Sequence, residues 1–164
     1  MVLRSIKIMV VAGIALFFTL VAYGNIIDYP SNWAFVQHVL SMDTTFKSPA
    51  LMTRQILDPN IQAIAYWLII GTEIAAALFC WLGAAILLWH RHDAKQFSQK
   101  KKIANLGLAI GLFLYLFCFL IIAGEWFAMW QSTQWNAEQT ASYLSLIILL
   151  SLVFLNQESP EKST

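Results

Sequence analysis

The sequence predicts an all-α, four-span transmembrane helix bundle, in which short amphipathic extracytoplasmic helices form a cap. Hydrophobic residues make up 59% of the 164 residues and charged residues only 12%, a balance too apolar for a soluble domain of this length. Four long apolar segments stand out along the chain, and basic residues gather on one side of them. We therefore expect one integral membrane domain over residues 1–164.

The four expected spans cover residues 6–23, 63–89, 103–123 and 139–155. Each approaches the roughly 20 residues that cross a bilayer of about 30 Å at 1.5 Å per residue. The first span is preceded by basic residues, as a signal peptide is, but its apolar run continues without a small-x-small cleavage site. We expect it to be retained as a span.

The first connection, residues 24–60, carries signals for two short helices. In SNWAFVQHVLSM, Trp33 and Val36 share one helical face with the apolar residues of the next turn. SPALMTRQIL starts with Ser48 as an N-cap before Pro49, and DPN repeats this start signal before the second span. Two interpretations stay open: the helices anchor the loop at the membrane surface, or they form a binding cap.

The second connection on the same side, residues 124–138, completes the expected cap. It places Trp126, Trp130 and Trp135 within a few residues of Glu125. Tryptophan is enriched where hydrocarbon meets water, so an aromatic belt is the simpler interpretation. A surface for a ligand or a partner is the alternative.

Basic residues predict the orientation of the chain. Arg4 and Lys7 precede the first span, and five more basic residues fall within 91–102, between the second and third spans. The other two connections contain only Lys47 and Arg54. Because cytoplasmic loops carry the excess of lysine and arginine, we expect both termini in the cytoplasm.

Glu73 is an ionisable side chain with long apolar runs on both sides. On a helical wheel it shares a stripe of polar and small residues, comprising Gln62, Tyr66, Glu73, Ala76, Ala77, Cys80 and Ala84. Three hypotheses compete: a neutral carboxyl hydrogen-bonded to Tyr115 or a carbonyl group, an ion pair with Arg54, or a titrating proton or cation site. We group Glu73, Tyr66 and Tyr115 as a candidate intramembrane polar site.

Small residues also predict which spans pack closely. The third span contains GLAIG, which puts Gly107 and Gly111 four residues apart on one face. The stripe around Glu73 is likewise rich in small residues, and such residues let helix backbones approach. We expect the second and third spans to form a close pair.

The sequence provides little support for catalysis or a cofactor. It lacks a phosphate-binding glycine loop, an HExxH motif and a nucleophile with a plausible base, so we expect no enzyme. His38 is expected a full bilayer away from His90 and His92, so no pair could ligate a b-type haem from within the membrane. We expect no metal and no cofactor. The KKK run is typical of a topology signal that contacts anionic lipid, and we expect no nucleic-acid partner.

Three features together resemble a known family: NIIDYPSNWAFVQHVLSMDT after the first span, Glu73 in the second, and GEWFAMWQSTQWN after the third. The chain resembles a bacterial family of predicted small integral membrane proteins, domain-of-unknown-function family 2165. The resemblance implies four spans and a bacterial inner (plasma) membrane location. It also draws attention to a candidate outer cap site, to which we add the basic residue Arg54: Asn25, Asp28, Tyr29, Asn32, His38, Asp43, Arg54, Glu125, Trp126, Trp130, Trp135 and Asn136.

Two functions are consistent with these patterns. The first is a non-enzymatic accessory or assembly subunit that binds a partner through its outer cap, since the body is too small to resemble a complete transporter. The partner would be another membrane or periplasmic protein, or a second copy of the chain, in addition to the lipid bilayer. The alternative is a small proton- or cation-conducting channel or carrier that uses Glu73.

Overall fold

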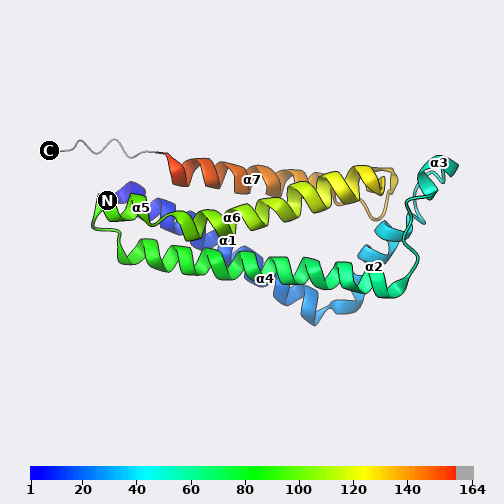
Figure 1. Ribbon diagram of the computed structural model, residues 1–164, viewed down its shortest axis with the longest axis horizontal. Coiled ribbons are helices and arrows are strands. Elements are labelled where there is room, and N and C mark those ends of the chain that lie inside the picture. The colour runs from blue at the N-terminus through cyan, green and yellow to red at the C-terminus, as the bar shows by residue number, and fades with distance from the viewer. Residues whose placement is uncertain (158–164) are drawn as a thin grey trace.

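The computed structural model describes residues 1–157, in which the regular structure is helical throughout (Figure 1). In chain order the helices are α1 (Val2–Ile27), α2 (Tyr29–Ser41), α3 (Pro49–Met52), α4 (Pro59–Trp89), α5 (Ala94–Gln99), α6 (Lys102–Leu112), the π-helix η1 (Phe113–Trp126), the 3₁₀ turn η2 (Met129–Gln131) and α7 (Glu138–Asn156). The predicted all-α class is confirmed.

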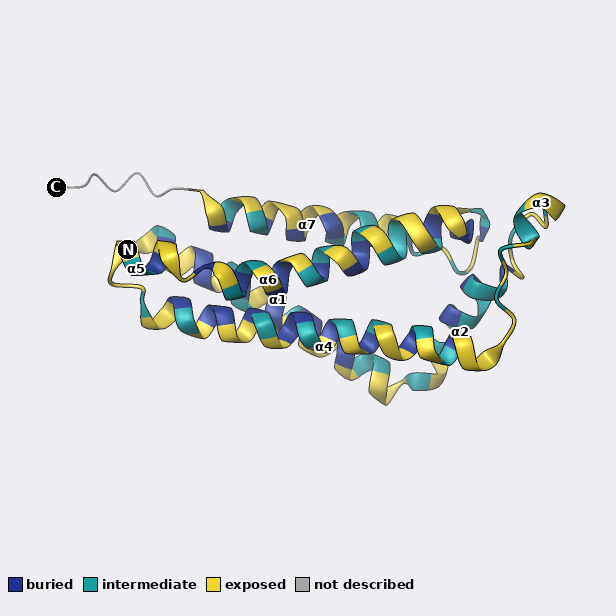
Figure 2. Cartoon of the chain, in the orientation of Figure 1, coloured by how far each residue is buried: buried dark blue, intermediate teal, exposed yellow. Residues whose placement is uncertain are grey.

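Four helices in the described part of the chain are long and apolar enough to cross a membrane: Val2–Ile27, Pro59–Trp89, Ala94–Trp126 and Glu138–Asn156. Each contains one of the expected spans. Exposed residues recur along the long helices (Figure 2). Many of them are large and apolar. In a bilayer these residues contact lipid.

Local start signals explain where the second span begins. Pro59 is the first residue of α4, and the Asp58 carboxylate accepts a hydrogen bond of 2.8 Å from the backbone N–H of Asn60. This is the capping predicted from DPN. Pro49 likewise opens α3 after Ser48, but the Ser48 side chain makes no capping bond there.

The spans pack in a ring in which α1 lies along α4, α4 along α6, and α7 along α6 and η1. The backbones of α4 and α6 approach each other closely. A Cβ added at Gly83 would lie 2.5 Å from the Cα of Ala104, and one at Gly107 would lie 2.6 Å from the backbone N of Cys80. The expected close pair of the second and third spans is confirmed, and small residues make it possible.

The third span differs from the expected α-helix in its second half. From Phe113 the helix widens into a π-helix that runs to Trp126, and a backbone bond from Phe127 N–H to the Ile122 carbonyl (3.0 Å) follows its i to i+5 pattern. Such helices usually last a single turn and occur frequently at functional sites. Neither Leu112 nor Phe113, where the π-helix starts, is a proline or a glycine, so the local sequence does not predict the change.

Helices α2 and α3, the end of η1 and the turn that follows it gather at one end of the bundle, and we call residues 28–58 and 125–137 the cap (Figure 1). Val39 and Met42 pack there against Phe127 and Met129. The Ile56 N–H donates to the Leu40 carbonyl at 2.8 Å, which ties the loop after α3 back to α2. That the cap lies outside the cytoplasm stays a prediction.

Helix α1 ends beside the middle of α4, and this offset shapes the cap-side half of the molecule. Asn25, in the last turn of α1, contacts Glu73, near the midpoint of the 31-residue α4. Beyond that level α2 takes the place of α1: Val36 packs against Tyr66 and Ile70. The cap therefore begins at the depth of Glu73.

Candidate functional site

Glu73 lies inside the bundle, with 2% of its side chain exposed. The stripe predicted to share its face is buried throughout: Gln62, Tyr66, Ala76, Ala77, Cys80 and Ala84. The same wheel predicts that Ile74, Leu78, Leu82 and Ile86 point away from the stripe. The first three are exposed, whereas Ile86 is half-buried. The helical wheel therefore correctly predicted that the Glu73 side chain faces the interior of the bundle, because α4 is a regular α-helix on both sides of Glu73.

The hydrogen-bond partner of Glu73 is Asn25. The Asn25 side-chain amide nitrogen lies 3.0 Å from one carboxylate oxygen and 2.7 Å from the other, and donates to both. The Tyr66 hydroxyl donates to the Asn25 backbone carbonyl at 2.9 Å. That carbonyl is in the last turn of α1, where it lacks an intrahelical donor. Tyr66 thus holds the end of α1 where Asn25 can reach Glu73.

Both partners named from the sequence for Glu73 are wrong. Arg54 lies in the cap, where it donates to the Trp126 carbonyl at 3.3 Å and stacks 4.5 Å from the centre of the Trp126 ring. Tyr115 lies near Glu73, but its ring packs among phenylalanines and its hydroxyl makes no bond to the acid. Within residues 1–157, no lysine or arginine side chain pairs with Glu73.

A cavity of about 350 Å³ lies beside the Glu73 carboxylate in the cap-side half of the bundle. Residues from five elements line it: α1, α2, α4, η1 and α7. Its polar lining comes from Glu73, Asn25, Asn32, Tyr66, Tyr115 and Thr140, and the remaining lining is Phe17, Val21, Phe35, Val36, Ile69, Phe119, Ala137, Ala141 and Leu144. The intramembrane polar site predicted from Glu73, Tyr66 and Tyr115 is therefore brought together around one space.

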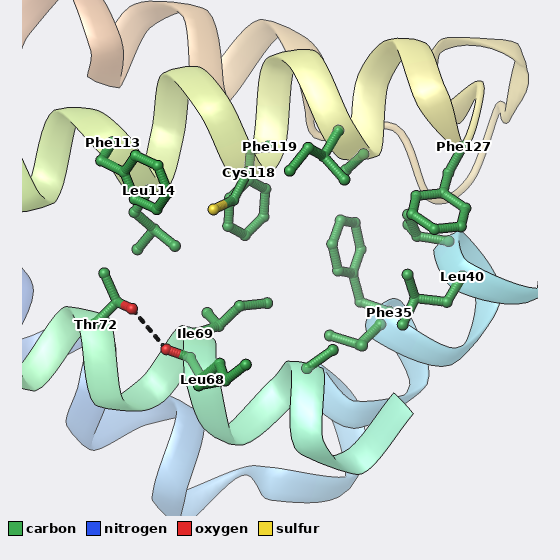
Figure 3. Close-up of a pocket in the computed structure, with 15 residues that line it drawn as sticks. Phe35, Leu40, Leu68, Ile69, Thr72, Phe113, Leu114, Cys118, Phe119 and Phe127 are labelled. Atoms are coloured by element: carbon green, nitrogen blue, oxygen red, sulfur yellow. Dashed lines mark hydrogen bonds between the residues drawn. The ribbon is translucent and has the colours of Figure 1, made fainter. Parts of the chain in front are cut away.

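A second, apolar groove of about 400 Å³ lies between α4, η1 and α2 (Figure 3). Thr72 is its main polar side chain, and the Thr72 hydroxyl already donates to the Leu68 carbonyl at 2.7 Å. Phe35 of α2 and Phe119 of η1, whose rings stack 6.3 Å apart, line both this groove and the Glu73 cavity. Together with Val36 and Ile69 they form the wall between the two spaces.

The predicted outer cap site does not form one cluster. Asn25 and Asn32 lie at the Glu73 cavity, while Tyr29 packs on the Tyr66 ring at 4.8 Å. His38 bonds Asp43 at 2.7 Å and stacks on Trp135 at 4.5 Å. The others lie elsewhere in the cap. Asp28 accepts from the Ser31 hydroxyl, Arg54 stacks on Trp126, and the Trp130 ring meets Phe46. The Asn136 side chain accepts from the Glu138 N–H at the start of α7, and Glu125 is exposed at the end of η1.

Several residues of these sites were not singled out from the sequence. Phe35, Phe119 and Thr140 line the Glu73 cavity. Phe46, which meets Trp130, and Ser132, which accepts from the Thr44 hydroxyl, hold the two parts of the cap together. Aromatic residues are too common in spans to mark a cavity. One feature of the sequence could have identified Asn25 as the partner of Glu73. It is the last uncharged polar residue before α1 ends, in a chain that has an intramembrane acid with no basic residue in the same span.

Four apolar helices around a buried acid, with no strand among residues 1–157, define the chain as a multi-span integral membrane protein. A model of the family described as "Predicted small integral membrane protein (DUF2165)" matches residues 3–158, and the chain belongs to that family. Comparison with curated proteins and with solved structures gave no match.

Proposed function

We propose that this membrane protein is a non-enzymatic accessory or assembly subunit that binds a protein partner through its cap. The supporting observation is that large apolar side chains are exposed on the cap although contacts within the cap hold several of them in place. Phe46, Leu57, Trp126 and Trp130 are all exposed, Phe46 by 71%. Exposed apolar groups gathered on an ordered surface are typical of interaction sites.

These side chains are held in place by the cap itself. The Phe46 ring meets the edge of Trp130 at 5.9 Å, and the Phe46 N–H donates to the Gln131 side chain at 2.9 Å. Arg54 covers one side of the Trp126 ring. Aromatic groups fixed before binding lose little conformational entropy when a partner arrives, so they are suited to anchor an interface.

Site-specific photo-crosslinking in the native host tests this proposal. A photoreactive phenylalanine analogue replaces Phe46 or Trp130 in the cap, and Leu150, which is 64% exposed on α7, provides the lipid-facing control. We expect a discrete protein adduct from the cap positions and lipid adducts alone from Leu150. Adducts with lipid alone at all three positions, together with a monomer in mild detergent, would refute the proposal and support membrane anchoring by the cap.

The expected location is the bacterial inner membrane with both termini in the cytoplasm. The proposal depends on this orientation, because it places the cap where a periplasmic or membrane partner can reach it. The distribution of basic residues supports it: Lys95, Lys100 and Lys102 lie at the end of the bundle opposite the cap.

A second candidate is the proton or cation path through Glu73, favoured by the cavity beside that acid. The α4 residues that line the cavity, Tyr66, Ile69 and Glu73, all lie on the cap side of the close α4–α6 contact, so we expect a path across the bilayer to need an oligomer. This candidate predicts proton flux in liposomes that Glu73→Gln abolishes while Asp93→Asn, at an exposed acid far from the cavity, retains it. Absence of flux in the parent protein would eliminate it.

A further inference from the structure

The chemistry of the Glu73 cavity indicates a ligand, whether or not the cap binds a partner. A carboxylate has about four lone-pair sites for hydrogen bonds, and Asn25 occupies two of them. The carboxylate lies against a space of about 350 Å³, and no cationic side chain among residues 1–157 pairs with it. The site therefore has capacity for a positively charged group that the chain itself does not provide.

The remainder of the lining determines what kind of cation fits. Five aromatic side chains border the cavity: Phe17, Phe35, Tyr66, Tyr115 and Phe119. A hard metal cation takes six or more oxygen ligands, whereas this cavity provides one carboxylate and a few neutral oxygens. Aromatic rings stabilise ammonium groups that carry apolar substituents, through cation–π attraction and apolar contact. The volume is at the small end of known ligand pockets.

We propose that the Glu73 cavity binds a small hydrophobic monocation, an ammonium group with apolar substituents. Its positive charge lies against the Glu73 carboxylate, and its apolar part lies among Phe17, Phe35 and Phe119. Asn25 keeps the carboxylate in position, since Tyr66 holds the end of α1 from which Asn25 projects. The ligand enters a space that is already formed, so binding requires little rearrangement of the helices.

Calorimetric titration of the full chain in nanodiscs of zwitterionic lipid tests this inference. The probe is benzyltrimethylammonium, and neopentylbenzene is its neutral isostere; empty nanodiscs correct for partitioning into lipid. We expect saturable binding of the cation and no saturable binding of the neutral compound. Equal saturable binding of both, or no saturable binding of the cation, would overturn the inference.

Two matched variants then assign the binding to Glu73. Glu73→Gln keeps the shape and removes the charge, and should weaken cation binding about tenfold or more. Asp93→Asn removes one negative charge from an exposed residue that caps α5, and should leave binding unchanged, since asparagine also caps. Equal affinity in the parent protein and Glu73→Gln would refute the proposal.

A third variant changes the volume of the cavity and keeps the charge of Glu73. It also tests the proposal if Glu73→Gln does not fold. Val21 lines the cavity and is half-buried, so Val21→Phe should fill part of the space while leaving the Glu73 carboxylate intact. We expect it to weaken cation binding, with helicity by circular dichroism unchanged. Full binding by folded Val21→Phe would show that the cation binds elsewhere and overturn the assignment.

Discussion

Replacing Gly83 by alanine tests the close α4–α6 contact directly. The new Cβ would lie 2.5, 2.6 and 2.7 Å from the Cα, N and Cβ of Ala104. Carbon atoms prefer separations of about 3.5–4.0 Å, so the two helices must move apart by about 1 Å. The obstructing atoms are mostly backbone, which cannot rotate away. Overpacking of this kind typically costs about 1–3 kcal/mol.

Gly71→Ala is the matched control, because it places the same change in the same helix. A Cβ at Gly71 meets nothing within 4 Å, so only helix propensity changes there, which favours alanine by up to about 1 kcal/mol. We therefore expect unfolding in sodium dodecyl sulfate, followed by circular dichroism, to shift to lower detergent for Gly83→Ala and to remain or rise for Gly71→Ala. Equal shifts for the two variants would refute the close contact.

Two further predictions concern the polar site and the orientation. Asn25→Leu removes the donor of the buried Glu73 carboxylate and should lower the free energy of unfolding by about 1–3 kcal/mol in the same assay; an unchanged value would contradict the hydrogen bond. The orientation is tested with single cysteines introduced by Gln55→Cys, at an exposed position in the cap, and by Lys95→Cys, at an exposed position at the opposite end. Both native cysteines lie inside spans. A membrane-impermeant maleimide should label only Gln55→Cys from the periplasmic side, and labelling of Lys95→Cys instead would reverse the orientation.

The sequence was sufficient for the features that depend on local pattern. Glu73 points into the bundle on the same face as the small residues that follow it by three, four and seven positions, Ala76, Ala77 and Cys80. The 3.6-residue period of α4 places all of them on one side of the helix. The start of α4 at Pro59 follows from the same local chemistry, since Asp58 caps it. Neither inference needed to know where the other helices lie.

The partner of Glu73 could not be predicted because it depends on how two helices are offset. Arg54 is only nineteen positions from Glu73 in the sequence, but α4 carries the acid away from the cap while Trp126 holds Arg54 there. Asn25 reaches the acid because α1 ends beside the middle of α4. The change from α-helix to π-helix at Phe113 could not be predicted either, because no residue type at that position favours it.

The size of the buried residues along α4 explains why α4 lines the Glu73 cavity and the apolar groove only at Glu73 and on its cap side. Away from the cap, the face of α4 that meets α6 carries Cys80 and Gly83, and the backbones touch. Toward the cap the buried residues are Ile70 and Tyr66, and α2 is inserted beside them. Large side chains hold the helices apart, and the space between them is incompletely filled. Glu73 lies where the small residues give way to large ones, so the acid has both a rigid support and an adjacent cavity.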